Sequence, residues 1–347
     1  MIDGEIYADR ARRLAKGGPF LAAGRENMIY LSGTDAALFV VITGRGEPVL
    51  LTSRMEVGRA RRQSYSQEVI AFQRSRTRLL EGEVCVFDSA AGALKGILGE
   101  RGIDEIRFDS LSEKVFHDLS PLGLKRSRAV EEMRVLKSRE EIELIREARR
   151  VIGEVYDEVS SGLDDGITEL AVAGRIISSV MSRGAESAFD PIVGFDENSA
   201  MPHGKPGRKA LSGASVILLD LGARVGGYCS DITRTVARTP AARRDLEAVK
   251  NVVEEVADSM EVGMKLSEAD SHARESLGAD SALMTHGLGH GLGLAVHEGP
   301  ILAPGSDDVL RDGMVFTIEP GVYREGKHGI RWEEDYICWG GGVEPVL

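Results

Sequence analysis

Two aspartates in one stretch of the chain have the residue type and the spacing of a metal site. Asp220 lies in the apolar run 215–221, and Asp231 lies in residues 228–237, whose side chains alternate in character. Glycines between the two segments indicate a hairpin. A turn centred on Val225 and Gly226 would set the aspartates directly opposite each other, with Cβ atoms about 5 Å apart. Because two such carboxylates repel, we expect either a divalent cation between them or an ordinary hairpin with surface aspartates.

A glycine-rich loop concentrates three of the seven histidines of the chain. His286, His290 and His297 lie within the segment THGLGHGLGLAVHEGP. The glycines beside them disfavour a helix and leave room for a ligand close to the backbone. Because neutral imidazole is a good ligand for a divalent ion, the loop predicts a functional site.

Two glutamates repeat the pattern of the aspartates. Glu319 ends the predicted strand GMVFTIEP, and Glu333 lies inside the predicted strand GIRWEEDYIC. A turn at residues 325–327 would bring the two glutamates opposite each other. Together with the aspartates and a histidine they make about five oxygen and nitrogen ligands. Such a set suits a pair of Mn, Co, Fe or Zn ions better than one structural zinc ion, whose site would be richer in cysteine.

The composition excludes several classes of function. The 347 residues are 42% hydrophobic and 28% charged, which is typical of a soluble protein with two domains. The apolar runs are too short to span a bilayer. The net charge of −12 argues against a nucleic-acid partner. The widely spaced cysteines and the acidic first residues, without the apolar core of a signal peptide, predict a cytoplasmic protein without disulfides.

The elements that must position these residues divide the sequence into two parts. Over residues 1–126, short apolar strands alternate with helical stretches, which predicts a small α/β domain. Residues 127–347 mix helices and strands without that simple alternation. A long charged helix should begin at the N-cap Ser138, with Glu141 three residues later, and end at Gly162. Further helices are predicted over residues 168–183, 241–262 and 267–277.

With these motifs the sequence resembles the pita-bread metallopeptidases of family M24, which include prolidase, aminopeptidase P and methionine aminopeptidase. The order Asp, Asp, His, Glu, Glu matches, as does the eleven-residue step between the aspartates. The segments GHGLGLAVHE, IEPG and IRWEED are most similar to the prolidase and aminopeptidase P branch. The resemblance implies an α+β fold: a pita-bread catalytic domain, with an antiparallel sheet flanked by helices, follows a smaller N-terminal α/β domain.

The resemblance also implies two divalent metal ions, Mn or Co in the first place and Zn or Fe otherwise, that hold a bridging hydroxide as the nucleophile. Glu333 rather than Glu334 matches the family pattern Arg-x-Glu, which begins here at Arg331. The implied ligands are Asp220, Asp231, His290, Glu319 and Glu333, of which Asp231 and Glu333 would be shared by both ions.

Further residues match catalytic and substrate-binding positions of the family. Glu319 resembles the general base, and His203 and His297 match histidines that contact the substrate and stabilise the tetrahedral intermediate. Without the resemblance, His203 in its Gly/Pro-rich loop would be interpreted as a surface histidine. The implied substrate-binding residues are Phe189, His203, His286, His297 and Arg331.

One position departs from the prolidase pattern. In some prolidases an arginine four residues after the position of His297 helps to hold the carboxylate of the dipeptide, and Ile301 stands there in this chain. The loss of that anchor leaves two substrates open. The chain would be an Xaa-Pro dipeptidase, or it would act like aminopeptidase P on longer peptides; in either case the partners would be small peptides and a second copy in a homodimer.

Two interpretations of other classes stand beside the peptidase. A catalytically silent relative would use the same fold as a binding module, because fold alone does not prove activity. A relative of creatinase would carry out metal-free chemistry on a small guanidino compound. The complete set of metal-binding side chains favours the metallopeptidase over both alternatives.

Overall fold

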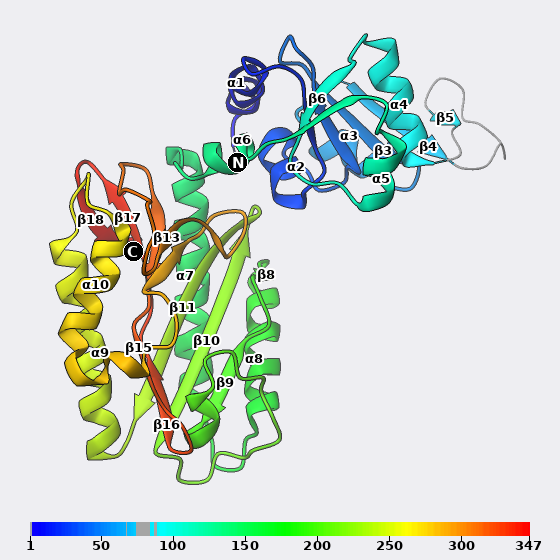
Figure 1. Cartoon of the computed structure of the whole chain (residues 1–347). Helices are drawn as coiled ribbons and strands as arrows, with labels where there is room; N and C mark the ends of the chain where they lie inside the picture. Colours follow the sequence, from blue (N-terminus) through cyan, green and yellow to red (C-terminus); the bar gives the residue numbers. More distant parts are fainter. Residues whose placement is uncertain (1, 67, 74–83, 87–88) are drawn as a thin grey trace. The chain divides into compact units, whose positions relative to one another are not determined.

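The computed structural model describes residues 2–66, 68–73, 84–86 and 89–347. The chain forms two compact units, Met1–Arg134 and Val135–Leu347, so the division falls after residue 134 rather than after residue 126 (Figure 1). Each unit has its own buried apolar core. No helix within the described ranges is long and apolar enough to cross a membrane.

The N-terminal unit is built on a seven-stranded sheet with the strand order β5-β4-β3-β2-β1-β6-β7. Antiparallel pairs join β1, β2 and β3, and the remaining neighbours are parallel. Apolar side chains of α4 pack with those of β1, β2 and β3 in one core. The strands are β1 (Phe20–Ala22), β2 (Phe39–Ile42), β3 (Pro48–Ser53), β4 (Glu68–Gln73), β5 (Val84–Val86), β6 (Glu105–Phe108) and β7 (Gly123–Arg126), and the helices are α1 (Gly4–Ala15), α2 (Arg25–Ser32), α3 (Val57–Gln63), α4 (Ala90–Glu100), α5 (Glu113–Asp118) and α6 (Ala129–Arg134).

The first two helices of the C-terminal unit begin and end where their capping residues predict, whereas α9 ends at Ser259, before the predicted residue 262. A capping box between Ser138 and Glu141 starts the 23-residue helix α7, and Gly162 follows its last residue. Thr168 caps α8 through a hydrogen bond to a backbone N–H of the first turn. These helices are α7 (Arg139–Ser161), α8 (Glu169–Ser182), α9 (Pro240–Ser259) and α10 (Leu266–Leu277), with two short 3₁₀ helices, η1 (Asp196–Ala200) and η2 (Gly278–Leu283).

The strands of the C-terminal unit form two main antiparallel sheets and one short hairpin. One sheet has the order β11-β10-β8, with β9 also paired to β10, and the other has the order β13-β12-β14-β17-β18; β15 and β16 pair with each other. The bounds are β8 (Glu186–Ser187), β9 (Ile192–Phe195), β10 (Val216–Val225), β11 (Tyr228–Ala237), β12 (Gly289–Gly291), β13 (Glu298–Leu302), β14 (Val315–Ile318), β15 (Gly321–Arg324), β16 (His328–Arg331), β17 (Glu334–Trp339) and β18 (Gly342–Pro345).

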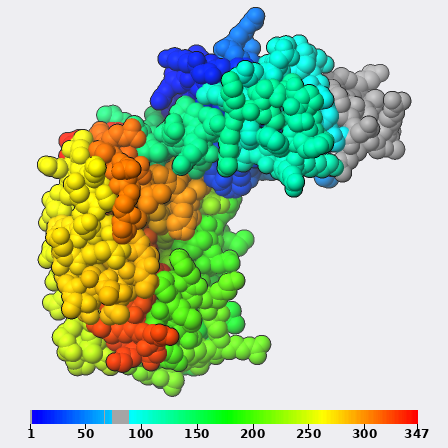
Figure 2. Space-filling view, viewed as in Figure 1, coloured from blue at the N-terminus to red at the C-terminus, as the bar shows by residue number. Residues whose placement is uncertain are grey.

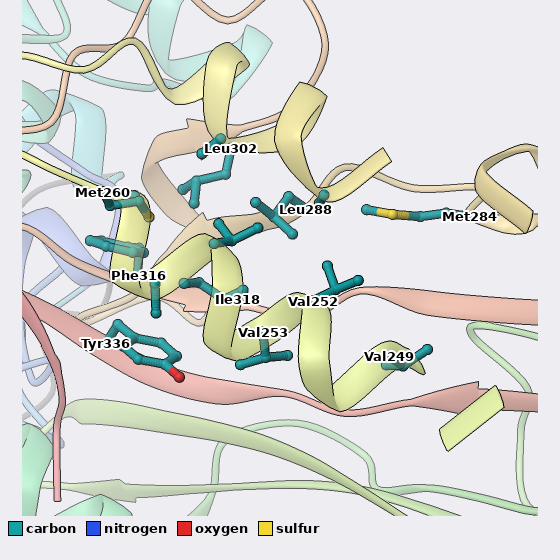
Figure 3. Packing of buried hydrophobic residues seen from close by; sticks show 14 of the residues in the cluster. Val249, Val252, Val253, Met260, Met284, Leu288, Leu302, Phe316, Ile318 and Tyr336 are labelled. Atoms are coloured by element: carbon teal, nitrogen blue, oxygen red, sulfur yellow. The ribbon is translucent and has the colours of Figure 1, made fainter. Parts of the chain in front are cut away.

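Helices cover these sheets through two apolar clusters. Valines of α9 pack with residues of β14 and β17, among them Phe316 and Ile318 (Figure 3). Helices α7 and α8 pack on the face of β10 that carries Ile217, Leu219 and Leu221. Because side chains alternate along a strand, Asp220 lies on the other face of β10. In the space-filling view, orange and red C-terminal segments lie between the yellow and the green parts of the C-terminal unit (Figure 2).

The register of the β10–β11 hairpin corrects one prediction. Val225 pairs with Tyr228 across a two-residue turn of glycines, both with positive φ, as tight hairpin turns require. Asp220 therefore pairs with Thr233, and the prediction that it lies directly opposite Asp231 is wrong. The predicted turn is too early along the chain, which displaces the partner of Asp220 by two residues. A displacement of two residues keeps the face, so both aspartates still lie on one face as diagonal neighbours.

The second pair of carboxylates has the predicted register. The turn at residues 325–327 joins β15 to β16, and Arg324 pairs with His328. The pairing of β14 with β17 and the pairing of β15 with β16 follow the same register. Two residues separate β14 from β15, and two residues separate β16 from β17. Glu319 and Glu333 lie opposite each other in this gap. The break leaves their side chains outside the regular ladders, next to the β10–β11 hairpin, where the Glu333 N–H donates to the carbonyl of Thr233.

Candidate metal centre and substrate cavity

One cavity of about 750 Å³ in the C-terminal unit is lined by all ten predicted site residues. They come from segments that are far apart in the sequence and meet where the β10–β11 hairpin faces the gap between β14 and β15. The structure therefore brings the predicted residues together, while their individual roles stay predictions. The ten residues are Phe189, His203, Asp220, Asp231, His286, His290, His297, Glu319, Arg331 and Glu333.

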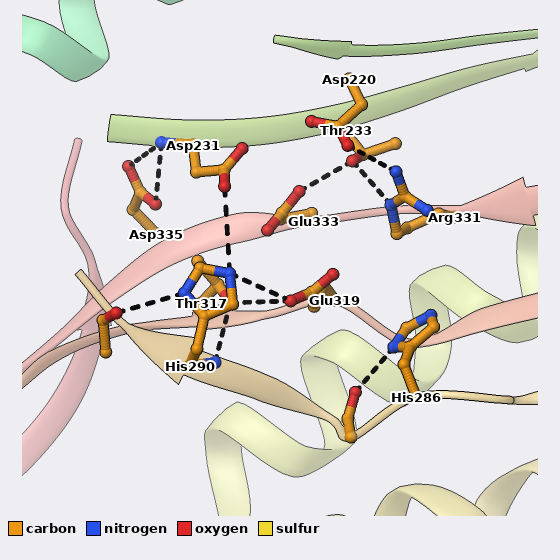
Figure 4. A network of polar contacts seen from close by, with 12 residues as sticks. Asp220, Asp231, Thr233, His286, His290, Thr317, Glu319, Arg331, Glu333 and Asp335 are labelled. Carbon is orange, nitrogen blue, oxygen red and sulfur yellow. Dashed lines mark hydrogen bonds and ion pairs between the residues drawn. The ribbon is translucent and has the colours of Figure 1, made fainter. Parts of the chain in front are cut away.

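Asp231, His290 and Glu333 form the centre of this group (Figure 4). Each offers one ligand atom, and these atoms all lie within 4.8 Å of one another. The Nε2 atom of His290 is 3.3 Å from Oε1 of Glu319 and 3.9 Å from Oδ2 of Asp231. Distances of this size leave space for an ion between carboxylate and imidazole ligands.

Two oxygen atoms of the group have no partner within the described part of the chain. Oδ1 of Asp220 and Oδ1 of Asp231 are buried and accept no hydrogen bond. An unsatisfied buried polar group costs about 1–3 kcal/mol, and native proteins rarely leave one. Divalent cations such as Mn²⁺ bind carboxylate oxygen atoms, so the residues present fit a metal centre.

Burial and mutual repulsion raise the pKa values of the carboxylates. Burial, followed by repulsion from Glu333 and Asp220, raises the pKa of Asp231 well above its usual value. Burial, followed by repulsion from Glu319 and Asp220, does the same to the pKa of Glu333. Burial raises the pKa of Glu319 to about 8. A nearby cation would lower all three values, because an opposite charge favours the ionised form.

His290 is held as a neutral ligand with one defined tautomer. Burial, and then the neighbouring His297, lower its pKa to about 4. Its Nδ1–H donates to the carbonyl of Gly291 at 3.2 Å, which leaves the lone pair of Nε2 directed at the carboxylates. This arrangement of the second ring nitrogen is typical of metal-binding histidines.

The glycines beside His290 are required by close strand contacts. A Cβ atom on Gly289 would lie 2.0 Å from the carbonyl oxygen of Thr317. One on Gly291 would lie 2.1 Å from the carbonyl oxygen of Gly299. The prediction that these glycines permit close backbone approach is therefore confirmed, and the approach is what aims His290 into the cavity.

Arg331 connects the first aspartate to the cavity wall. Its guanidinium donates to Oδ2 of Asp220 at 2.5 Å, to the Tyr323 hydroxyl at 2.7 Å and to Oγ1 of Thr233 at 2.9 Å. It also donates to the carbonyl of Pro202 at 3.2 Å. Each of the three guanidinium nitrogens thus donates at least one hydrogen bond, and the contact from Nη2 fixes the position of the Asp220 carboxylate.

His286 has both ring nitrogens occupied. Its Nδ1–H donates to the carbonyl of Gly287 at 2.7 Å, so Nε2 accepts a hydrogen bond from the Tyr323 hydroxyl at 2.8 Å. Burial lowers its pKa to about 4, which keeps the ring neutral. A polar contact between His286 and a substrate would therefore require one of these hydrogen bonds to break.

The two remaining histidines of the cavity are His203 and His297. The rings of His297 and His290 lie 4.2 Å apart, and burial followed by the nearby His203 lowers the pKa of His297. Within the described residues, neither His203 nor His297 makes a hydrogen bond. Phe189 forms part of the wall, since its ring packs so closely on Gly222 that a Cβ there would lie 2.5 Å from it.

Comparison with known families agrees with this geometry. The model of metallopeptidase family M24 matches residues 143–338, more than half of the chain. The chain belongs to metallopeptidase family M24. The model of the creatinase/prolidase N-terminal domain matches residues 19–122. The predicted family, the α+β pita-bread fold and the metallopeptidase class are therefore confirmed.

Solved structures and curated relatives of this M24 chain point to Xaa-Pro peptidases and to uncharacterized ones. An Xaa-Pro dipeptidase from Bacillus anthracis matches with a TM-score of 0.87 and 26% identity, over 99% of this chain and 97% of that one. An X-Pro aminopeptidase from Thermotoga maritima matches with a TM-score of 0.84 and 30% identity, over 97% of both chains. An uncharacterized peptidase of Bacillus subtilis is 35% identical over 63% of this chain and 64% of its own length.

Three residues around the M24 centre were not predicted. Thr233 donates to Oε2 of Glu333 at 2.7 Å, and Asp335 accepts from the Asp231 N–H at 3.2 Å. Each lies two residues from a predicted ligand in an extended part of the chain, so the two-residue period could have indicated it. Tyr323 carries no such signal, because its contacts depend on how β15 and β16 meet the loop of His286.

Proposed function

We propose that this chain is a dinuclear metal exopeptidase that hydrolyses Xaa-Pro bonds, with Xaa-Pro dipeptides as its first substrate class. The proposal is carried by the four carboxylates that meet His290 in one cavity, two of which have a buried oxygen atom without a partner among the described residues. Similarity to a solved Xaa-Pro dipeptidase and to a solved X-Pro aminopeptidase supports the substrate class.

The five proposed ligands divide between two ion sites. Asp231 and Glu333 would be shared by two ions, Asp220 would complete one site, and His290 and Glu319 would complete the other. Their separation supports this division, because Arg331 holds Asp220 while Glu319 lies 3.3 Å from His290. Mn or Co is proposed first, with Zn or Fe as alternatives. When bound, such ions supply an activated water molecule and polarise the scissile carbonyl.

Side chains of the protein would accept a proton and stabilise the negative charge that forms during the reaction. Glu319 is proposed as the general base, since it lies beside His290 and faces the cavity. Next to cations its carboxylate would be ionised and able to accept a proton. His203 and His297 are proposed as hydrogen-bond donors to the oxygen that becomes negative during attack, because their ring nitrogens are unengaged among the described residues.

A second substrate class has one observation in its favour. Ile301 lines the cavity and is 55% exposed, so an apolar side chain stands where some prolidases have the arginine. An aminopeptidase P-like enzyme acts on longer peptides and does not need a carboxylate anchor at that place.

The test is metal-dependent release of the first residue from Xaa-Pro dipeptides and Xaa-Pro-Xaa tripeptides, measured with added Mn or Co. We expect the wild type to cleave dipeptides preferentially and the variants His290→Ala and Glu319→Ala to be inactive. Glu325→Ala, in the exposed turn between β15 and β16, is the matched control and should remain active. Full activity of either site variant would refute the mechanism.

The same preparations distinguish the enzyme from a binding module. Metal content is measured by mass spectrometry on protein purified without chelators, and we expect two ions per chain. Protein without bound metal and without turnover would support a catalytically silent binding module. The homodimer and the cytoplasmic location stay predictions, and sedimentation of the purified protein tests the first of them.

A further inference from the structure

The cavity contains one cation whose charge is not compensated. Arg331 and Lys205 both line it, but Arg331 is engaged by Asp220 and three further acceptors. Lys205 is exposed and makes no hydrogen bond or ion pair with any residue that the structure describes. Apart from the carboxylate cluster, the remaining acidic lining residue is Asp190, also exposed. The outer part of the cavity thus offers an anion a single unpaired ammonium group among the described residues.

The segment that carries Lys205 is fixed at both ends. Glu169, fully buried at the start of α8, accepts the N–H of Phe195 at 2.8 Å and the N–H of Gly207 at 2.9 Å. It also accepts both hydrogen bonds donated by the side-chain amide of Asn198. A carboxylate that accepts from three donor groups of one loop holds the loop in a defined shape. Lys205 therefore projects from a positioned backbone, and only its side chain has to become ordered when it binds a ligand.

The segment is also tied to the catalytic residues. Arg331 donates to the carbonyl of Pro202, and His203 follows Pro202 directly. His203 and Lys205, two residues apart, line the same cavity. A substrate that meets His203 at its scissile bond therefore has its following residue within the region served by Lys205.

We propose that Lys205 recognises the C-terminal carboxylate of a dipeptide substrate, an inference that rests on the proposed exopeptidase function. A dipeptide carries its carboxylate one residue after the scissile bond, whereas a longer peptide has an uncharged amide there. Ile301, which lines the same cavity, offers no charge to that carboxylate. Lys205 thereby supplies the charge-assisted contact that favours dipeptides over longer peptides.

The experiment compares an Xaa-Pro dipeptide with its C-terminal amide, which differs only in the carboxylate. The ratio of kcat/KM for the dipeptide to kcat/KM for the amide is measured for the metal-loaded wild type and for Lys205→Met. We expect the ratio to fall about ten- to one-hundredfold, the range of one charge-assisted hydrogen bond, mainly through a higher KM for the dipeptide. Lys205→Arg should restore most of the ratio, because it keeps the positive charge.

Arg208→Met is the matched control. Arg208 is exposed in the same segment, does not line the cavity and makes no ion pair with the described residues, so the variant changes the net charge equally. A ratio that is the same in Lys205→Met as in the wild type, or a fall of equal size in Arg208→Met, would overturn the role of Lys205. A wild type that does not distinguish acid from amide would overturn it as well.

A binding measurement separates this inference from the proposed function. If the metal-loaded wild type cleaves no Xaa-Pro peptide, the proposed function fails, and the same dipeptide and amide are then compared by calorimetry as uncleaved ligands. A weaker Kd for the dipeptide in Lys205→Met, with little change for the amide, would support the carboxylate site. Equal Kd values for both ligands in both proteins would refute it.

Discussion

Glu333 and Glu334 are neighbours in the chain, yet they belong to two regions with opposite charge balance. Glu333 is part of the carboxylate cluster, which consists of Asp220, Asp231, Glu319 and Glu333. Glu334 is the centre of an ion network with Arg149 and Arg234. Because successive side chains of an extended segment point to opposite faces, one glutamate faces the cavity and the other faces α7.

The ion network is complete within the chain. Glu334 accepts two hydrogen bonds from Arg149, at 2.5 and 2.9 Å, and one from Arg234 at 2.5 Å. Burial opposes ionisation of Glu334, but the bonds from Arg149 and Arg234 lower its pKa below the usual value. Arg234 also stacks over the ring of Trp332, 4.5 Å from its centre. This region needs no further charge, which is why Glu334 is unsuited to bind a metal ion.

The carboxylate cluster, in contrast, has too few counter-charges among the described residues. Within the part of the chain that the structure describes, Arg331 is the cation that contacts one of these acids, Asp220, while the pKa values of Asp231, Glu319 and Glu333 are all raised. The fold holds these acids together against their repulsion, and their charge is balanced only when cations are added. The difference between adjacent glutamates teaches that burial alone does not define a site; the supply of counter-charges by the chain does.

The largest effect should separate the two glutamates by function. Glu333→Gln removes the charge of a proposed ligand while keeping its shape. We expect metal content to fall and kcat/KM to drop by more than about a hundredfold, which exceeds the loss typical of a residue that only hydrogen-bonds to a metal ligand. Glu334→Gln should retain its metal. Mass spectrometry of the metal and steady-state kinetics measure both. Retention of metal and activity by Glu333→Gln would contradict the claim that Glu333, unlike Glu334, binds a metal ion.

The next effect concerns stability, and here we expect the variant of Glu334 to lose more than the variant of Glu333. In metal-free protein, Glu334→Gln leaves two largely buried arginines without their partner and should lower the free energy of unfolding by about 3 kcal/mol. Glu333→Gln resembles the protonated acid that burial already favours, so we expect a change below about 1 kcal/mol. Urea titrations of both variants measure these values. Equal losses would show that the cluster is balanced without metal.

Much of the fold was predictable because local signals agreed with it. The capping box at Ser138 predicted the start of α7, and the turn at residues 325–327 set Glu319 opposite Glu333. The register of β10–β11 was missed by two residues, although the pair Gly226-Gly227 is a strong signal for a two-residue hairpin turn. Both aspartates nevertheless lie on one face of the hairpin, because a shift of two residues keeps a side chain on the same face of a strand.

The contacts of the site were less accessible from the sequence. The resemblance to known metallopeptidases assigned the ligands, whereas spacing alone did not select His290 among three histidines. The bonds of Arg331 to Asp220 and Tyr323 join residues from three separate strands. Such contacts depend on how the two sheets meet, and no local pattern encodes that arrangement.

The smallest effect is a difference in pH dependence. The pKa of Glu319 is raised from 4.5 to about 8 in the folded, metal-free chain, and those of Asp231 and Glu333 move in the same direction. A raised pKa means that the folded state binds more protons, so this stabilisation is complete below about pH 4.5 and is lost as the pH rises to about 8. We therefore expect the Tm of metal-free protein to fall by several degrees between pH 5 and pH 8.

Bound metal should cancel that fall, because cations stabilise the ionised carboxylates. The gap in Tm between metal-loaded and metal-free protein should therefore widen from pH 5 to pH 8, as calorimetry would measure. Glu334 has the opposite sign: its lowered pKa gives stability that is present at neutral pH and lost only as the pH falls below its usual range. The variant Glu334→Gln should thus keep the widening gap, whereas Glu319→Gln should reduce it. A gap that is constant with pH in the wild type would mean that the cluster is ionised without metal, and the contrast between the two regions would fail.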